Sequence, residues 1–82
     1  LTADFGLSNG SDETATFQRT VIKNSRNKYL LLPSSKIGVN SFVKVCDANE
    51  FDTLITDWDC AEEQIIALED TGIKVIVAEE VK

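Results

Sequence analysis

Histidine and methionine are absent from this chain of 82 residues, and cysteine occurs only twice, at Cys46 and Cys60. Without histidine, neither thiol has an imidazole partner for nucleophilic catalysis, and the two thiols alone do not form a zinc site. We therefore expect no catalytic residue, no metal and no cofactor. Two reduced thiols are the favoured interpretation of the pair, and a single disulfide is the alternative.

Basic residues are also scarce in this chain. Lysine and arginine together number 8 against 14 aspartates and glutamates, so the net charge is −6. An acidic chain repels the phosphate backbone of nucleic acids, so we do not expect these residues to bind DNA themselves. No apolar stretch approaches membrane-spanning length, and no signal-peptide pattern is present. The sequence therefore favours a cytoplasmic protein without a membrane partner.

The remaining composition is typical of a folded globular chain. Hydrophobic residues make up 43% and charged residues 27%, with one proline and four glycines, which argues against disorder. A chain of this length is one domain or part of one. Because it begins at Leu1 and has no methionine, we expect residues 1–82 to be a piece of a longer protein.

Hydrophobic spacing and turn residues predict alternating helices and strands. The first helix has Ser11 or Asp12 as its N-cap. In the second helix, Asp59 and Glu62 have the spacing of a capping box, and Gly72 suits a left-handed position after the last turn. The predicted elements are the end of a strand over 1–5, a loop over 6–11, a helix over 13–25, strands over 29–32, 42–45 and 53–56, a turn over 47–50, a helix over 59–72, a strand over 73–78 and a polar tail over 79–82.

The apolar residues of these elements predict how they pack. Ala61, Ile65 and Leu68 recur at helical spacing and predict one buried stripe on the second helix. The strands are mostly continuous apolar runs, which is typical of a parallel sheet with both faces covered. Residues 53–78 therefore form a strand–helix–strand unit in an α/β protein.

Polar residues follow the buried strand predicted over 29–32. Pro33 is followed by the hydroxyls of Ser34 and Ser35 and by the ammonium of Lys36. In open α/β sheets, ligands bind in the crevice beyond the carboxyl ends of the strands, and these groups are donors that suit a phosphate. The alternatives are a solvated loop lysine and ordinary turn chemistry for the two serines.

A second polar tip follows the strand predicted over 53–56. Asp57 and Asp59 are placed to accept hydrogen bonds from sugar hydroxyls in the same crevice. Helix capping is the alternative, which we favour for Asp59 and leave open for Asp57. Cys60 is interpreted as a small residue of the first helical turn rather than as a reactive thiol.

Taken in order, Ser34-Ser35-Lys36-Ile37-Gly38 and Asp52-Thr53-Leu54-Ile55-Thr56-Asp57 resemble the C-terminal effector domain of DeoR-type transcriptional regulators. The resemblance implies a three-layer α/β/α Rossmann-like parallel sheet, similar to ribose-5-phosphate isomerase and glucosamine-6-phosphate deaminase. It implies that residues 1–82 are the C-terminal portion of the sensor domain, without the winged helix-turn-helix DNA-binding region.

The function implied by this resemblance is the sensing of a phosphorylated sugar, which changes the affinity of the intact, oligomeric regulator for DNA. The expected ligand-binding residues are Ser34, Ser35, Lys36, Asp57 and Gly6, and no catalytic role is expected. The family carries an aspartate where this chain has Pro33. Proline offers neither a carboxylate nor an amide donor, so we expect a different ligand or a weaker affinity.

Other interpretations of the sequence remain open. A sugar-phosphate isomerase of the same fold needs a general base, for which only Asp57 or Glu50 is available. A structural or oligomerisation piece needs no ligand at all. Asp4-Phe5-Gly6 matches the metal-binding segment of protein kinases, but the chain has no other kinase motif and is too short for a kinase lobe, so we treat the match as chance.

Overall fold

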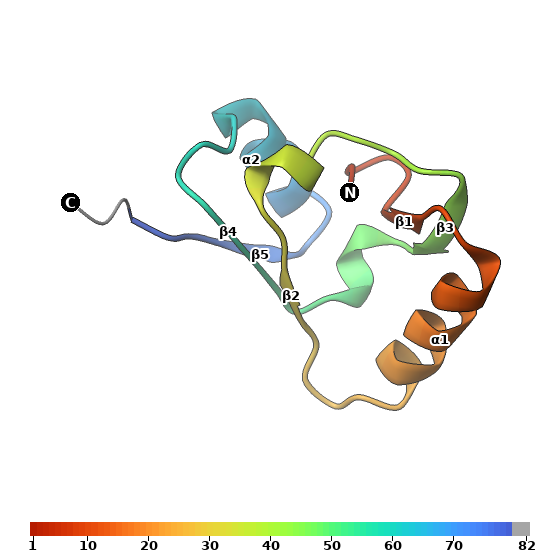
Figure 1. Cartoon of the computed structure of the whole chain (residues 1–82). Coiled ribbons are helices and arrows are strands. Elements are labelled where there is room, and N and C mark those ends of the chain that lie inside the picture. Colours follow the sequence, from red (N-terminus) through yellow and green to blue (C-terminus); the bar gives the residue numbers. More distant parts are fainter. Residues whose placement is uncertain (80–82) are drawn as a thin grey trace.

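Two separate sheets form the framework of the computed structural model, which describes residues 1–79 (Figure 1). In the first sheet, β1 (Leu7–Asn9) pairs antiparallel with β3 (Val43–Cys46). In the second, β2 (Tyr29–Leu31), β4 (Thr53–Thr56) and β5 (Lys74–Val77) run parallel, with β4 in the centre. The predicted α/β class is confirmed, but the strand predicted over 42–45 does not join the parallel sheet.

Two predictions for residues 1–11 are wrong. Residues 1–5 were expected to end a strand, but the backbone of Thr2 and Gly6 closes a turn through hydrogen bonds of 3.1 and 2.8 Å. The expected loop over 6–11 instead contains β1. Local sequence favours a loop there because Gly10 and its polar neighbours are turn formers. The strand forms because β3, more than thirty residues away in the chain, supplies its hydrogen-bonding partner.

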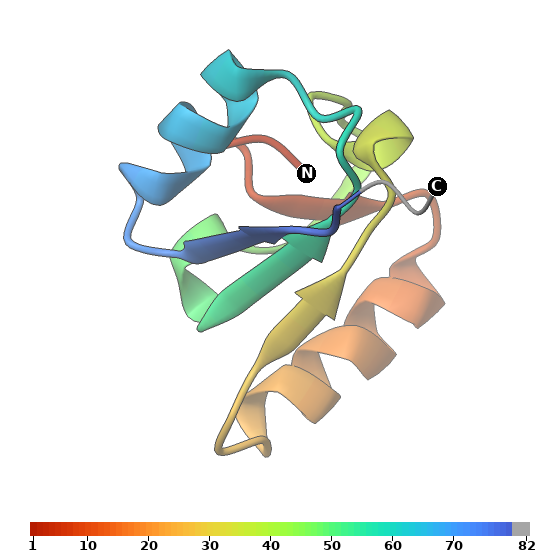
Figure 2. The same ribbon diagram turned by 90° about the vertical axis from the view of Figure 1, so that its left-hand side faces the viewer.

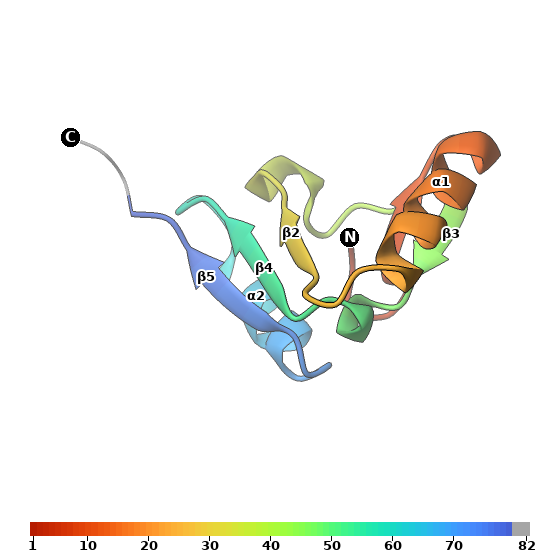
Figure 3. The same ribbon diagram turned by 90° about the horizontal axis from the view of Figure 1, so that it is seen from below.

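The first helix forms where the sequence predicts it. The helix α1 (Asp12–Lys23) begins after Ser11, whose hydroxyl oxygen accepts a hydrogen bond from the backbone N–H of Thr14. It packs against β1 and β3 rather than over the parallel sheet (Figure 3). Arg19 reinforces this packing, since its guanidinium donates to the backbone carbonyls of Lys44 and Val45.

The second helix is shorter than predicted. The helix α2 (Glu62–Glu69) has Ala61 at its N-cap without a side-chain hydrogen bond, so the capping box with Asp59 is wrong. Ala61 is exposed and Leu68 fully buried, so the predicted stripe holds only in its later part. Gly72 has a φ of +107°, as expected for the turn that leads into β5. The strand–helix–strand unit is confirmed, with α2 beside the parallel sheet (Figure 2).

The two faces of the parallel sheet differ in burial. Leu30, Leu54 and Val75 share one register row, and Leu54 at its centre is fully buried in the core. Their neighbours alternate to the other face, where Leu31 on the edge strand β2 is 69% exposed. The prediction that 29–32 is a buried strand is therefore wrong in its burial, since Tyr29 and Leu31 are both exposed.

The remaining predictions concern short segments. The turn predicted over 47–50 is confirmed as the 3₁₀ helix η2 (Ala48–Glu50). Of the polar tail predicted over 79–82, residues 80–82 lie outside the described part of the chain. Within the described residues, no helix is both long and apolar enough to cross a membrane.

Candidate functional site

The carboxyl ends of β2 and β4 bring the two predicted polar tips together. After β2, Pro33 leads into the 3₁₀ helix η1 (Ser34–Lys36), which has no side-chain cap of its own. The backbone N–H of Ser34 donates a 2.8 Å hydrogen bond to Oδ2 of Asp57, which follows β4. The other carboxylate oxygen accepts from the backbone N–H of Asp59 at 3.0 Å. Asp57 therefore holds the loop after β2 against the loop after β4.

These hydrogen bonds fix the charge of Asp57. Chiefly the backbone N–H of Ser34, and then the Ser34 hydroxyl and the backbone N–H of Asp59, lower the pKa of the Asp57 carboxyl below its ordinary 3.8. The group is therefore ionised at neutral pH. Because a carboxylate occupies the Ser34 amide and repels anions, this point of the site does not suit a phosphate. It suits donors such as sugar hydroxyls.

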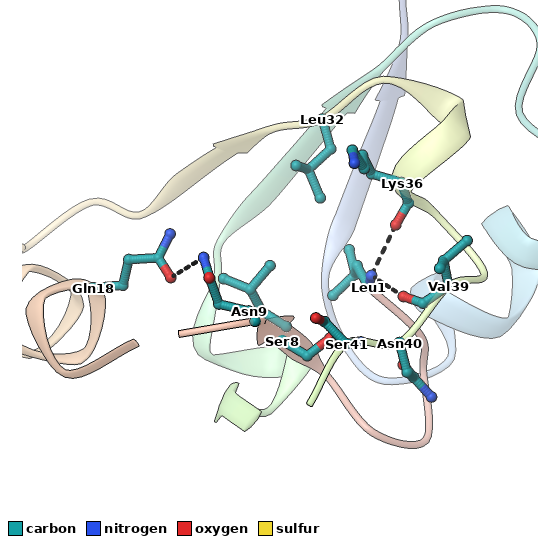
Figure 4. A pocket seen from close by; sticks show the side chains of 11 residues that line it. Leu1, Ser8, Asn9, Gln18, Leu32, Lys36, Val39, Asn40 and Ser41 are labelled. Atoms are coloured by element: carbon teal, nitrogen blue, oxygen red, sulfur yellow. Dashed lines mark hydrogen bonds between the residues drawn. The ribbon is translucent and has the colours of Figure 1, made fainter. Parts of the chain in front are cut away.

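Lys36 and Asp57 line different cavities, and Leu32 lines both of them. A cavity of about 420 Å³ is lined by Lys36, Leu32 and Leu1 among others (Figure 4). The backbone of Lys36 is well fixed, since its N–H donates to the Pro33 carbonyl at 2.9 Å and its carbonyl accepts from the Leu1 nitrogen at 2.8 Å. Asp57 lines a second cavity of about 310 Å³, with Leu32 and Pro33. The structure thus places Lys36 and Asp57 at two different cavities that share Leu32.

Three predicted site residues, Ser34, Ser35 and Gly6, line neither cavity. Ser35 is exposed and lines neither of them. Gly6 is buried, and a side chain there would place its Cβ atom 2.1 Å from the carbonyl oxygen of Cys46. The structure therefore gives Gly6 a packing reason that is independent of any ligand.

Most of the polar lining of the larger cavity was not predicted from the sequence. It comes from the end of β1, from α1 and from the loop before β3, and it consists of Ser8, Asn9, Gln18, Asn40 and Ser41. Two of these residues are tied by a 2.8 Å hydrogen bond from the backbone N–H of Ser41 to the Ser8 hydroxyl. Asn-Gly and Asn-Ser pairs are ordinary turn signals, so nothing local marks these positions as a site.

The lining of the larger cavity carries a positive charge, although the chain as a whole is acidic. Lys36 is its one charged side chain among the described residues, and no carboxylate lines it, although the chain has 14 acidic residues. The other polar side chains of the lining are neutral amides and hydroxyls. An ammonium is a donor that suits an anionic group, and amides suit hydroxyl groups. Glu50, a base considered for an isomerase, lines neither this cavity nor the one beside Asp57.

The two cysteines are free thiols, as the favoured interpretation predicts. Burial, and then the nearby carboxylates of Glu50 and Asp47, raise the pKa of Cys46 to about 11. Burial also raises the pKa of Cys60. Both groups are therefore protonated and weakly nucleophilic at neutral pH. Within residues 1–79, no group of three or more histidine, cysteine, aspartate or glutamate side chains is arranged to hold a metal ion.

Comparison with known proteins gives one match. A family model described as the DeoR C-terminal sensor domain matches residues 1–58. No curated protein and no solved structure matches the chain.

Proposed function

Because the chain belongs to the DeoR C-terminal sensor domain family, we propose that it binds a phosphorylated sugar and thereby controls the DNA binding of a transcriptional regulator of sugar metabolism. In this proposal the domain is a regulatory one, and the intact protein represses or activates sugar-catabolic genes. The ligand supplies one anionic group and several hydroxyls. The larger cavity offers complementary groups for both.

The observation that carries the proposal is the charge of the larger cavity. Lys36 is the one charged side chain among the described residues that line it, and amides and hydroxyls make up the other polar side chains. A lysine ammonium is a common partner of phosphate, and a volume of about 420 Å³ is in the range of small-molecule sites. No carboxylate of residues 1–79 lines the cavity to pair with a cationic ligand.

Asp57 has a supporting part in this proposal. The family aspartate before the two serines is Pro33 here, which leaves the loop without a carboxylate of its own. Asp57, from the neighbouring strand, provides an acceptor to the Ser34 N–H and so holds the short helix that carries Lys36. Ser34 and Ser35 then shape this loop, and the phosphate binds at Lys36 rather than at their hydroxyls.

The coupling to DNA needs a second site. With a net charge of −6, residues 1–82 are poorly suited to contact DNA, so the DNA contacts come from a winged helix-turn-helix region outside them. The sugar phosphate changes the DNA affinity by binding one arrangement of a homo-oligomer more tightly than another. Repression and activation differ only in which arrangement binds DNA.

A thermal-shift and calorimetric titration tests the proposal. The full chain is titrated with a panel of pentose and hexose monophosphates, beside a Lys36→Ala variant and a Lys74→Ala control on the exposed side of β5. A ligand that binds only the folded state raises the melting temperature. We expect at least one sugar monophosphate to do so, and loss of the charged partner to weaken its binding by roughly tenfold to a hundredfold.

The control separates a specific role of Lys36 from a general loss of positive charge. Lys74→Ala removes the same charge from an exposed lysine that does not line the cavity, so it should bind as the parent does. If no sugar monophosphate binds the parent, or if Lys36→Ala binds as tightly as Lys74→Ala does, the proposal is wrong.

A further inference from the structure

Gln18 lies across the larger cavity from Lys36. It comes from α1, whereas Lys36 comes from the short helix after β2, and Figure 4 shows the two side chains on opposite sides, with Ser8 and Ser41 between them. The residues on either side of Gln18 in α1 are exposed, but Gln18 itself is half-buried against the cavity. The cavity therefore has a cationic end and an amide end.

The amide end is organised by hydrogen bonds between side chains. The side-chain Nδ2 of Asn9 donates to Oε1 of Gln18 at 3.4 Å, and the side-chain Oδ1 of Asn9 accepts from the backbone N–H of Ser11 at 3.2 Å. This arrangement turns the Nε2 donor group of Gln18 away from Asn9 (Figure 4). None of the hydrogen bonds within the described part of the chain uses that NH₂ group. Gln18 thus brings to the lining of the cavity a neutral donor without a partner among the described residues, on a side chain that is held by its neighbour.

A neutral amide donor and an ammonium select different parts of one ligand. The ammonium of Lys36 favours the phosphate, while an amide binds a hydroxyl oxygen without requiring a charge. We propose that Gln18, held by Asn9, is the residue that recognises the hydroxyl-bearing end of a phosphorylated polyhydroxy ligand whose phosphate lies at Lys36. This inference rests on the proposed function, and it adds the orientation of the ligand and a residue that determines its specificity.

The variant Gln18→Met tests this role. Methionine has a similar length and helix propensity but no amide, so α1 should remain intact. Calorimetric titrations of the full chain use inorganic phosphate and, separately, pentose and hexose monophosphates. We expect Gln18→Met to weaken sugar monophosphate binding by about threefold to tenfold, the effect of one neutral hydrogen bond, and to leave inorganic phosphate binding unchanged. Lys36→Ala should weaken both.

The matched control is Gln64→Met, because Gln64 is the other glutamine of the chain and lies on α2 outside the lining of the cavity. It should bind both probes as the parent does, with melting temperatures of all variants recorded to verify folding. If Gln18→Met binds sugar monophosphates as the parent does while Lys36→Ala does not, the role of Gln18 is refuted and the proposed function stands. If Gln18→Met weakens the binding of inorganic phosphate and of sugar monophosphates equally, hydroxyl recognition by Gln18 is also refuted. If Lys36→Ala changes the affinity for neither probe, the proposed function itself is wrong.

Discussion

The backbone N–H of Ser34 lies 2.8 Å from Oδ2 of Asp57 and donates a hydrogen bond to it, which joins the ends of two neighbouring parallel strands. Two residues that are 23 positions apart in the chain are thus paired by the register of β2 and β4. Asp57 thereby provides the loop that contains Lys36 with a carboxylate acceptor, which Pro33 cannot provide. Together with the bond from the backbone N–H of Asp59, this hydrogen bond engages both carboxylate oxygens of Asp57.

Replacement of Asp57 by asparagine should make the folded state less stable in a pH-dependent manner. Because hydrogen bonds lower the pKa of Asp57 in the folded state, its ionised form stabilises that state. The contribution is complete above the ordinary pKa of 3.8 and disappears as the pH falls through the lower folded value. Urea unfolding of the parent and of Asp57→Asn should therefore differ at about pH 7, and the difference should shrink below about pH 4.

The matched control for Asp57 is its exposed neighbour Asp59. The Asp59 side chain makes none of the hydrogen bonds found in residues 1–79, so Asp59→Asn should change the free energy of unfolding little at any pH. A difference between Asp57→Asn and the parent that is constant from about pH 7 to about pH 3 would contradict the role of the charge.

Replacement of Thr56 by valine should stabilise the protein. Thr56 ends the central strand β4 and is only 3% exposed, and its hydroxyl oxygen is buried without a hydrogen-bond partner in the described residues. Valine has nearly the same shape and removes the unpaired group, so we expect a gain of about 1 kcal/mol in the free energy of unfolding.

Thr71 provides a control of opposite sign. Its hydroxyl donates to the Leu68 carbonyl at 2.6 Å, so Thr71→Val should lose about 1 kcal/mol. Chemical denaturation of both variants measures the pair. A Thr56→Val protein that is less stable than the parent would mean that the hydroxyl has a partner, such as a buried water.

Replacement of Gly6 by alanine should be strongly destabilising. Gly6 has a φ of +84°, and its Cβ position lies 2.1 Å from the Cys46 carbonyl oxygen, which is backbone and cannot rotate away. Strain and displacement together should cost more than about 2 kcal/mol.

Two other glycines separate the causes of this effect. Gly72 also has a positive φ, +107°, but nothing lies within 4 Å of its Cβ position, so Gly72→Ala should cost only about 1 kcal/mol. At Gly10 the nearest atom is the Ser41 hydroxyl at 3.5 Å, so Gly10→Ala should be close to neutral. In thermal unfolding of the three variants, Gly6→Ala should lower the melting temperature far more than Gly72→Ala or Gly10→Ala. Equal losses for Gly6→Ala and Gly72→Ala would exclude the steric contribution.

The elements that depend on nearby residues could be predicted from the sequence. Residues 53–56 form a strand, Ser11 caps α1, and Gly72 has the positive φ that a turn requires, because each depends on neighbours within one or two turns of the chain. The family resemblance rested on two short segments, residues 34–38 and 52–57, and it is confirmed over residues 1–58. These features follow from local periodicity, capping and turn chemistry.

Only the tertiary structure decided how those elements pack and which residues they bring into contact. It paired β1 with β3, exposed the outer face of β2, joined Ser34 to Asp57, and placed Gln18 opposite Lys36. Each of these depends on contacts between segments that are far apart in the chain, and turn residues such as Asn9 or Ser41 carry no local mark of the cavity that they line. The sequence by itself determined the helices and most of the strands, because these depend on local propensity. It also determined the family, because the resemblance depends on short motifs. The cavity needed the fold, because its charged and neutral ends come from distant segments that only long-range packing brings together.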